Sequence, residues 1–365
     1  MGGGIQLKGY VVLETGEVFE GTLHSKSTEV YGEIVFFTGM SGYQEVLSDP
    51  SFKGQMVVFT YPLIGNYGVN DSDFESIIPH VNALVVSELS NEGFHYESCS
   101  SLLSYCEKQS IPLISGVDTR AIVKRIREQG DMRAIITTDP SNLSFDHYLP
   151  LGQQEVVPMV SSSSIETHGS GEHHVVMMDF GYKKSILDSL LKLGNKVTVV
   201  PYDTTFEQIE QLQPDGILYS NGPGNPKQLE YLLPTIKKVA ETFPTMGICL
   251  GHQLLALAFG ADTEKLTFGH RGANQPVMDL STNKVYMTSQ NHSYVVNEQS
   301  LKDTGFEAKF VNINDRSIEG LMHKEYPVFT VQFHPEAHPG PSDSEQLFYT
   351  FIEMLGNKGR EKAYA

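Results

Sequence analysis

The sequence predicts an α/β protein with a strand-rich, mixed first domain and a second domain built on a doubly wound, mostly parallel sheet. Its 365 residues suit two domains. Residues 161–164 (SSSS) and 168–171 (HGSG) have little to bury and need no fixed backbone, so we expect a linker at residues 151–172. After residue 173, strand and helix patterns alternate with short joints, as in an open parallel sheet covered on both faces. We therefore predict domains at residues 1–150 and 173–365.

The charge and the cysteine content indicate which partners the protein does not bind and which compartment suits it. The net charge of −18 argues against nucleic acids and anionic membranes as partners. The three cysteines, Cys99, Cys106 and Cys249, form no CxxC pair and no disulfide framework, which fits a reducing compartment. We expect a soluble cytoplasmic protein without a metal site, in which Cys99 and Cys106 pack along one helix.

Alternating apolar residues predict strands throughout the first domain. Residues 10–14 and 18–23 flank a Thr15-Gly16 turn and are expected to form a hairpin. A helix is expected near residues 98–109, and a second one begins at the cap Asp118 and ends at Gly130. Residues 39–51 are rich in turn formers. The remaining predicted strands are 32–38, 55–60, 83–89, 111–115 and 133–138.

The second domain alternates regularly between the two kinds of element. Its predicted strands are 175–179, 197–200, 216–220, a strand that ends before Cys249, and a strand from residue 328. Its predicted helices are 184–193, 206–212, 229–241 and the apolar stretch after Cys249. Sites in such sheets gather at the carboxyl ends of the strands, so the loops that follow these strands are where we expect function.

The stretch Gly247-Ile248-Cys249-Leu250-Gly251 reads as a strand end, a turn that carries a cysteine, and the start of a helix. Gly-x-Cys-x-Gly is typical of a nucleophile elbow, where glycines leave room on both sides of a strained nucleophile. Backbone N–H groups at the start of the helix would stabilise negative charge on the sulfur. The alternative is a buried structural cysteine beside a core helix.

A cysteine nucleophile needs a base, and the base needs an orienting group. His334 follows the predicted strand from residue 328, and Glu336 lies two residues further on. The carboxylate would accept a hydrogen bond from one ring nitrogen and so fix the tautomer. Among 13 histidines, an ordinary hydrogen-bonded side chain is the alternative. We predict that Cys249, His334 and Glu336 form a catalytic triad.

The segment NGPGNP at residues 221–226 follows the strand before the Cys249 strand, so both loops should face the same crevice. This segment could be a simple turn. Its glycines also allow close approach of a ligand, and N–H groups near Gly224 and at Leu250 could form an oxyanion hole. The chain contains no GxxxxGK[ST] motif, so we do not expect it to bind ATP.

Together, NGPGNP, GICLGHQLLA and the late HPE are similar to the motifs of class I (triad) glutamine amidotransferases, whose catalytic domain is flavodoxin-like. The first half narrows this resemblance. GEIVFFTGMSGYQEVLSDPSF, TYPLIGNYGVN and GVDTRAIVKRIRE resemble the N-terminal domain of carbamoyl-phosphate synthase small chains. The resemblance extends from roughly residue 7 to residue 355.

The resemblance implies that glutamine is bound by Ser51, Gly222, Gly224, Leu250, Gln253, Asn291, Ser293 and Tyr294. Ser293 stands where the family usually has glycine, so a contact there would have to run through the backbone. The resemblance also implies a hetero-oligomer. The small chain hydrolyses L-glutamine without a cofactor, and its ammonia passes through an internal tunnel to a large subunit that uses ATP, magnesium and bicarbonate to make carbamoyl phosphate.

Two other functions are weighed against this one. A free-standing cysteine-dependent γ-glutamyl hydrolase would account for the triad but not for the first 140 or so residues. A catalytically inactive regulatory subunit would not need an intact triad. Whether the carbamoyl phosphate serves arginine or pyrimidine synthesis stays open at this point.

Overall fold

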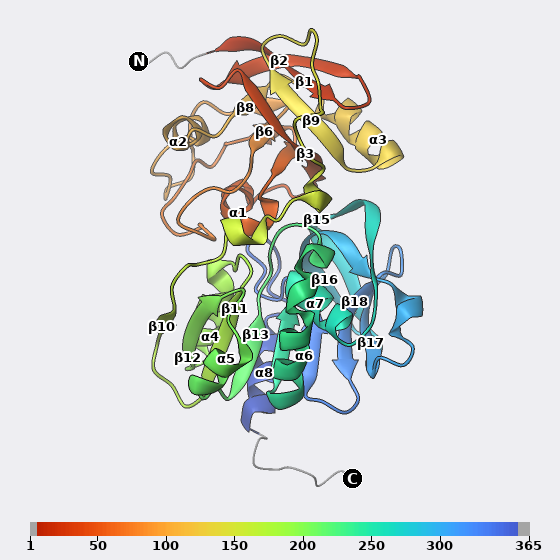
Figure 1. The fold of residues 1–365 in the computed structure, drawn as a ribbon. Helices are drawn as coiled ribbons and strands as arrows, with labels where there is room; N and C mark the ends of the chain where they lie inside the picture. The colour runs from red at the N-terminus through yellow and green to blue at the C-terminus, as the bar shows by residue number, and fades with distance from the viewer. Residues whose placement is uncertain (1–5, 357–365) are drawn as a thin grey trace. The chain divides into compact units, whose positions relative to one another are not determined.

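The computed structural model describes residues 6–356, in which the chain forms two compact units (Figure 1). The first unit comprises the chain up to Gln154 together with Leu266–Gly272. The second comprises Glu155–Lys265 and the chain from Ala273 onward. None of the helices in the described residues is both long enough and apolar enough to cross a membrane.

A closed barrel forms the first unit, with strands in the order β1-β2-β8-β6-β4-β3-β9. Successive side chains of a strand enter different apolar clusters: Ile34 and Phe36 lie in one, Val35 and Phe37 in the other. The predicted hairpin is present as the antiparallel pair β1–β2. A separate small sheet joins β5 and β7. The strands are β1 (Leu7–Leu13), β2 (Val18–His24), β3 (Glu29–Phe37), β4 (Gln55–Phe59), β5 (Leu63–Ile64), β6 (Ala83–Val85), β7 (Glu88–Leu89), β8 (Leu113–Ser115) and β9 (Met132–Thr137).

The α-helices of this unit are α1 (Tyr43–Ser48), α2 (Leu102–Gln109) and α3 (Thr119–Gln129). Helix α3 has the predicted caps, because the Asp118 side chain accepts a hydrogen bond from the Ala121 N–H and Gly130 ends the helix. Helix α1 and the 3-10 turn η1 (Pro50–Phe52) lie where the sequence indicates only turns. Nearly every residue of α1 is buried, so tertiary packing stabilises a helix too short to form alone.

The two cysteines of this unit differ in environment. Cys106 lies on α2 and is buried, as predicted. The prediction for Cys99 is wrong: α2 begins only at Leu102, and Cys99 is exposed, with its Sγ 3.7 Å from Oδ2 of Asp71. The weak apolar pattern before residue 102 therefore belongs to an irregular segment.

Residues Leu266–Gly272 are part of the long strand β15 (Thr263–Asp279), yet they pack within the first unit. Nη1 of Arg271 lies 3.1 Å from Oδ2 of Asp131, and both side chains are buried. The ring of Phe268 lies 5.7 Å from that of Phe36, centroid to centroid. A segment from late in the sequence thus completes the core of the first unit, which a division at residue 150 does not include.

A ten-stranded sheet forms the second unit, in the order β10-β12-β11-β13-β14-β19-β18-β16-β15-β17. Strands β12, β11, β13, β14 and β19 are parallel neighbours, which confirms the predicted fold class. Antiparallel strands extend the sheet beyond β19, in a region without strand–helix alternation. The strands are β10 (Glu166–His168), β11 (His174–Asp179), β12 (Lys196–Pro201), β13 (Gly216–Tyr219), β14 (Thr245–Ile248), β16 (Val285–Val296), β17 (Phe306–Asn312), β18 (Ile318–His323) and β19 (Val328–Val331).

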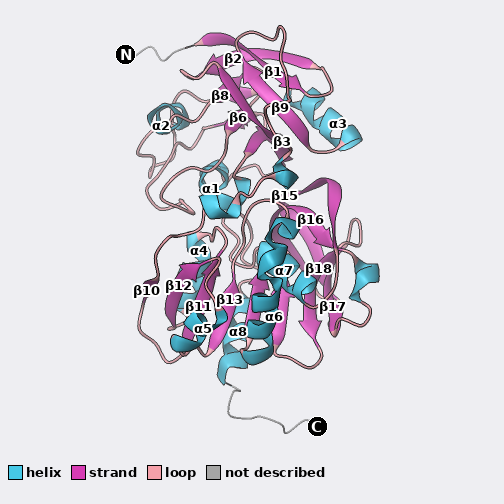
Figure 2. Ribbon diagram, viewed as in Figure 1, coloured by secondary structure: helices cyan, strands magenta, loops and turns pink. Residues whose placement is uncertain are grey.

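Helices cover both faces of the parallel strands (Figure 2). Val176 and Met178 of β11 pack with α5 (Phe206–Gln211), α6 (Leu233–Thr242) and α7 (Leu250–Ala258). Val175 and Met177 pack on the other face with α4 (Lys184–Lys192) and α8 (Gln346–Gly356). This alternation is the period of two expected for a strand buried on both faces.

Residues 151–172, for which the sequence predicts a linker, contain regular structure. They hold the 3-10 turns η2 (Leu151–Gln153) and η3 (Val157–Met159) and the edge strand β10, which pairs antiparallel with β12. Val157 is buried in a core cluster of the second unit. A further 3-10 segment, η4 (Pro226–Leu232), precedes α6, and η5 (Glu298–Leu301) precedes β17.

Candidate active site

Cys249 occupies a strained turn between β14 and α7. Its φ of 53° and ψ of −103° are rarely adopted by residues other than glycine, and such strain is characteristic of functional turns. Its N–H donates to the Val331 carbonyl at 2.8 Å, which fixes the turn to β19. A Cβ at Gly251 would lie 2.2 Å from the Tyr219 carbonyl oxygen, and one at Gly247 2.8 Å from the Gly251 carbonyl oxygen. Both glycines are therefore required by the closeness of neighbouring backbone.

His334 follows β19, which is the neighbour of β14 in the sheet. Its Nδ1 lies 2.6 Å from Oε1 of Glu336, and both side chains are buried. Since the carboxylate can only accept, Nδ1–H donates, and Nε2 is left as the nitrogen that can exchange a proton with a substrate or a nucleophile. Cys249 follows β14 and His334 follows β19, and these two strands are parallel neighbours, so the nucleophile and the histidine lie at the same edge of the sheet.

Lys183, which follows β11 and which the sequence analysis missed, completes this buried group. Its Nζ lies 3.1 Å from Oε1 of Glu336 and donates to the Ala337 carbonyl at 2.6 Å. Its own N–H donates to Oδ1 of Asn221, at 3.1 Å. Lysine is almost never fully buried unless it is paired. A lysine in the short loop between a parallel strand and the helix after it was the available signal.

The electrostatics of this group keep Glu336 ionised and favour the protonated ring of His334. Burial alone would raise the pKa of Glu336, but Lys183 and His334 outweigh it and lower the pKa well below its usual range. Burial alone would lower the pKa of His334, but the charge of Glu336 and its hydrogen bond to the ring, together with the nearby Cys249 side chain, raise it instead. His334 is therefore a strong acceptor for a proton from the nucleophile.

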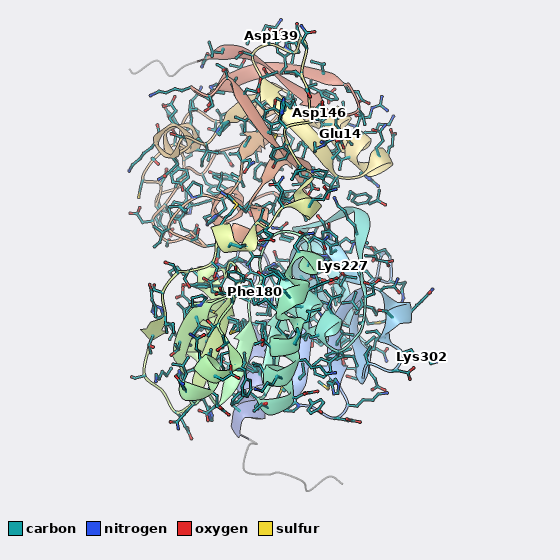
Figure 3. The ribbon with its side chains drawn as sticks, in the orientation of Figure 1. Glu14, Asp139, Asp146, Phe180, Lys227 and Lys302 are labelled. Atoms are coloured by element: carbon teal, nitrogen blue, oxygen red, sulfur yellow. The ribbon has the colours of Figure 1, made fainter. Side chains whose placement is uncertain are left out.

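Two glycines of the loop after β13 have no room for a larger side chain or need a backbone conformation that favours glycine. A Cβ at Gly222 would lie 2.3 Å from the carbonyl oxygen of Phe180, the residue labelled in Figure 3. Gly224 has a φ of 90°, in the left-handed region that favours glycine. The first N–H groups of a helix lack intrahelical partners, so that of Leu250 is suited to bind an anionic oxygen.

The predicted glutamine-binding residues of α7 and β16 lie together around Cys249. Sγ of Cys249 is 3.7 Å from the Asn291 carbonyl oxygen. Nε2 of Gln253, one turn after the cysteine, donates to the Tyr294 carbonyl at 2.8 Å. Ser293 lies between these contacts on the same strand and is half-buried. Backbone of β16 thus forms one wall beside the nucleophile.

Ser51, the other residue implied by the resemblance, belongs to the first unit. It lies in η1, and its N–H donates to Oδ1 of Asp49 at 2.8 Å. Its side chain is buried. The role of Ser51 in binding glutamine stays a prediction.

Comparison with known proteins agrees with these features. Residues 176–354 match the family model of class-I glutamine amidotransferases, and residues 11–136 match that of the carbamoyl-phosphate synthase small-chain domain. The arginine-specific carbamoyl phosphate synthase small chain of Halalkalibacterium halodurans is 63% identical, over 98% of this chain and 100% of the relative.

Two other relatives carry the same name. The arginine-specific small chain of Geobacillus stearothermophilus is 54% identical, over 96% of this chain and 98% of its own. The arginine-specific small chain of Bacillus subtilis is 53% identical, over 98% of this chain and 100% of its own length. With similarity of this degree along its whole length, and with both family domains in the expected order, the chain belongs to the carbamoyl phosphate synthase small-chain family.

Proposed function

We propose that this chain is the glutaminase subunit of a carbamoyl phosphate synthase and that Cys249 is its nucleophile. The observation that carries the proposal is the strained turn of Cys249 beside the buried His334–Glu336 pair, at the carboxyl ends of two adjacent parallel strands. Membership of the small-chain family over nearly the whole chain supports it and disfavours a free-standing γ-glutamyl hydrolase.

The residues have distinct roles in this reaction. The Cys249 thiol gives its proton to Nε2 of His334, and the sulfur attacks the side-chain amide carbon of L-glutamine. N–H groups of Gly224 and Leu250 hold the oxyanion. His334 then protonates the leaving nitrogen, which departs as ammonia, and a γ-glutamyl thioester remains on Cys249. Water, deprotonated by His334, hydrolyses the thioester to glutamate and restores the thiol.

Glu336 and Lys183 act through His334 rather than on the substrate. The carboxylate holds the Nδ1–H tautomer and stabilises the imidazolium, and Lys183 keeps that carboxylate charged. The backbone beside Cys249 and the predicted residues Gly222, Gln253, Asn291, Ser293 and Tyr294 bind the amino-acid end of glutamine in this proposal.

The partner is a large carbamoyl phosphate synthase subunit that fixes the released ammonia with bicarbonate and ATP. The name small chain, shared by the relatives, supports such an assembly. Three relatives are named arginine-specific, which supports a supply of carbamoyl phosphate to arginine synthesis. The cysteines are all free, as expected of a protein that works in the cytoplasm.

Replacing Cys249 with serine in the complex with the large subunit tests this function. We expect Cys249→Ser to abolish glutamine-dependent synthesis of carbamoyl phosphate and to leave ammonia-dependent synthesis unchanged, because only the nucleophile is lost. Cys106→Ser is the matched control, since Cys106 is also a buried free thiol but belongs to the other unit. Glutamine turnover at the wild-type rate in Cys249→Ser would refute the proposal.

A further inference from the structure

Asp179 is a buried carboxylate at the end of β11, where the loop of residues 180–183 begins and leads to α4. Its Oδ1 accepts hydrogen bonds from the N–H groups of Gly181 at 2.8 Å and Tyr182 at 3.0 Å. Its Oδ2 accepts from the N–H of Ser162 at 2.7 Å. Burying a carboxylate costs free energy unless hydrogen bonds compensate, and these three donors do so. The side chain therefore holds the loop that follows its own strand.

The other two N–H groups of this loop are also held by buried side chains. That of Phe180, the residue labelled in Figure 3, donates to Oγ of Ser220 at 3.0 Å. That of Lys183 donates to Oδ1 of Asn221 at 3.1 Å. All four N–H groups of the loop thus donate to side chains, and two of the four donate to Asp179. The conformation of the loop is therefore determined by side-chain acceptors, of which Asp179 contributes most.

Lys183 is the last residue of this loop, and its side chain extends from there to the triad. The ammonium lies 3.1 Å from Oε1 of Glu336 and donates to the Ala337 carbonyl at 2.6 Å. A buried ion pair offsets the cost of desolvation only when its geometry is close to ideal. Because a lysine side chain is long and flexible, its Nζ occupies one buried position reliably only if its backbone is fixed. The charge beside Glu336 therefore depends on the conformation of the loop.

We infer that Asp179 is a positioning residue for glutamine hydrolysis. By holding the loop it places the Lys183 ammonium against Glu336, and through that pair it acts on His334. The inference rests on the proposed glutaminase function, in which Glu336 and His334 belong to the triad. Within the described residues, the hydrogen bonds of Asp179 reach none of the residues expected to bind glutamine. Its loss should therefore slow the chemistry more than it weakens substrate binding.

The test compares variants of Asp179 in the complete complex with the large subunit. Asp179→Ala removes every acceptor, and we expect kcat with glutamine to fall about 10- to 100-fold, with a smaller change in KM and none in ammonia-dependent synthesis. Asp179→Asn keeps one oxygen that can accept from Gly181 and Tyr182, so it should retain most of the activity. Asp179→Ser keeps a hydroxyl acceptor, should show a smaller loss in the same direction, and serves as the test if Asp179→Ala does not fold.

A matched control and a double variant separate this role from a general loss of structure. Asp279 is also a buried carboxylate at a strand end, where it accepts from the Ser281 N–H at 2.8 Å, but it lies in the turn after β15. Asp279→Ala should therefore leave kcat unchanged. In a Lys183→Met background, Asp179→Ala should lower kcat by less than about twofold, because the ammonium that it positions is already absent. The same fold loss in both backgrounds would contradict the inference.

A second readout reports on the base itself. The charge of Lys183 lowers the pKa of His334, so displacement of the ammonium should let that pKa rise. We expect NMR titration of the full chain, labelled with ¹⁵N at histidine, to show a higher His334 pKa in Asp179→Ala than in the wild type, with the signals assigned by their loss in His334→Gln. An unchanged pKa or an unchanged kcat in Asp179→Ala would overturn the inference. If Cys249→Ser still abolishes glutamine-dependent synthesis in that case, the proposed function stands and only the role of Asp179 fails.

Discussion

Replacing Lys183 with methionine removes the cation from the buried group that supports His334. Its Nζ is 3.1 Å from Glu336 and 2.6 Å from the Ala337 carbonyl, and the side chain is only 2% exposed. Breaking a buried ion pair by removing one partner costs about 3–5 kcal/mol, because the other charge stays buried. For a unit of this size each kcal/mol lowers the unfolding midpoint by about 2–4 °C, so we expect Lys183→Met to lower it by about 6–20 °C.

The neighbouring residue provides a matched control. Lys184 is more than half exposed and pairs with Asp188 one turn away, so Lys184→Met should change stability by about 0.5 kcal/mol or less. Thermal unfolding of the full chain, followed by differential scanning calorimetry at pH 7.5, measures both variants. In Lys183→Met, a second change of Glu336→Gln should recover part of the loss, because it removes the unpaired carboxylate. Equal midpoints for the two lysine variants would refute the reasoning.

Three further predictions concern the turn, the base and the partner. Gly251→Ala should abolish glutamine hydrolysis, because the new Cβ would lie 2.2 Å from the Tyr219 carbonyl oxygen. Gly356→Ala on α8 is the control and should leave hydrolysis unchanged, because open space surrounds Gly356. Glu336→Gln should lower the pKa of His334, because the Glu336 carboxylate raises that pKa in the wild type. NMR titration of labelled histidine measures the pKa, and an unchanged value would contradict the His334–Glu336 pair. The isolated chain should release glutamate slowly and the large subunit with ATP and bicarbonate should accelerate it, so equal rates in both conditions would exclude coupling.

The sign of the pH dependence follows from the raised pKa of His334. The folded-state pKa lies above the usual value of 6.5, so the stability that the His334–Glu336 pair contributes is fully present below about pH 6.5. It is lost as pH rises through the folded-state pKa. The difference in unfolding free energy between wild type and Glu336→Gln should therefore shrink at alkaline pH.

The sequence was most informative where function depends on local backbone. Glycine at the positions around Cys249 and in the loop after β13 indicates that neighbouring atoms leave no room there for a side chain. The HPE triplet likewise shows a base and a carboxylate only two residues apart. Strand–helix alternation predicted the parallel half of the second unit because each element there is buried by its immediate neighbours in sequence.

Non-local contacts could not be predicted in this way. The packing of residues 266–272 in the first unit depends on Asp131, far away in the sequence, and no local pattern of β15 indicates it. Helix α1 exists because its surroundings bury it. The position of Lys183 after a strand marks it as a candidate, but only the fold shows that it is buried against Glu336.

The formation of a γ-glutamyl thioester on Cys249 is the central claim, and acid-quenched peptide mapping tests it most directly. The complex is mixed with glutamine, ATP and bicarbonate, quenched within a few turnovers, digested at low pH and analysed by mass spectrometry. We expect a γ-glutamyl group on the peptide that contains Cys249 and none on the same peptide of Cys249→Ser. A γ-glutamyl group on any other residue, with glutamine still hydrolysed by Cys249→Ser, would contradict the account.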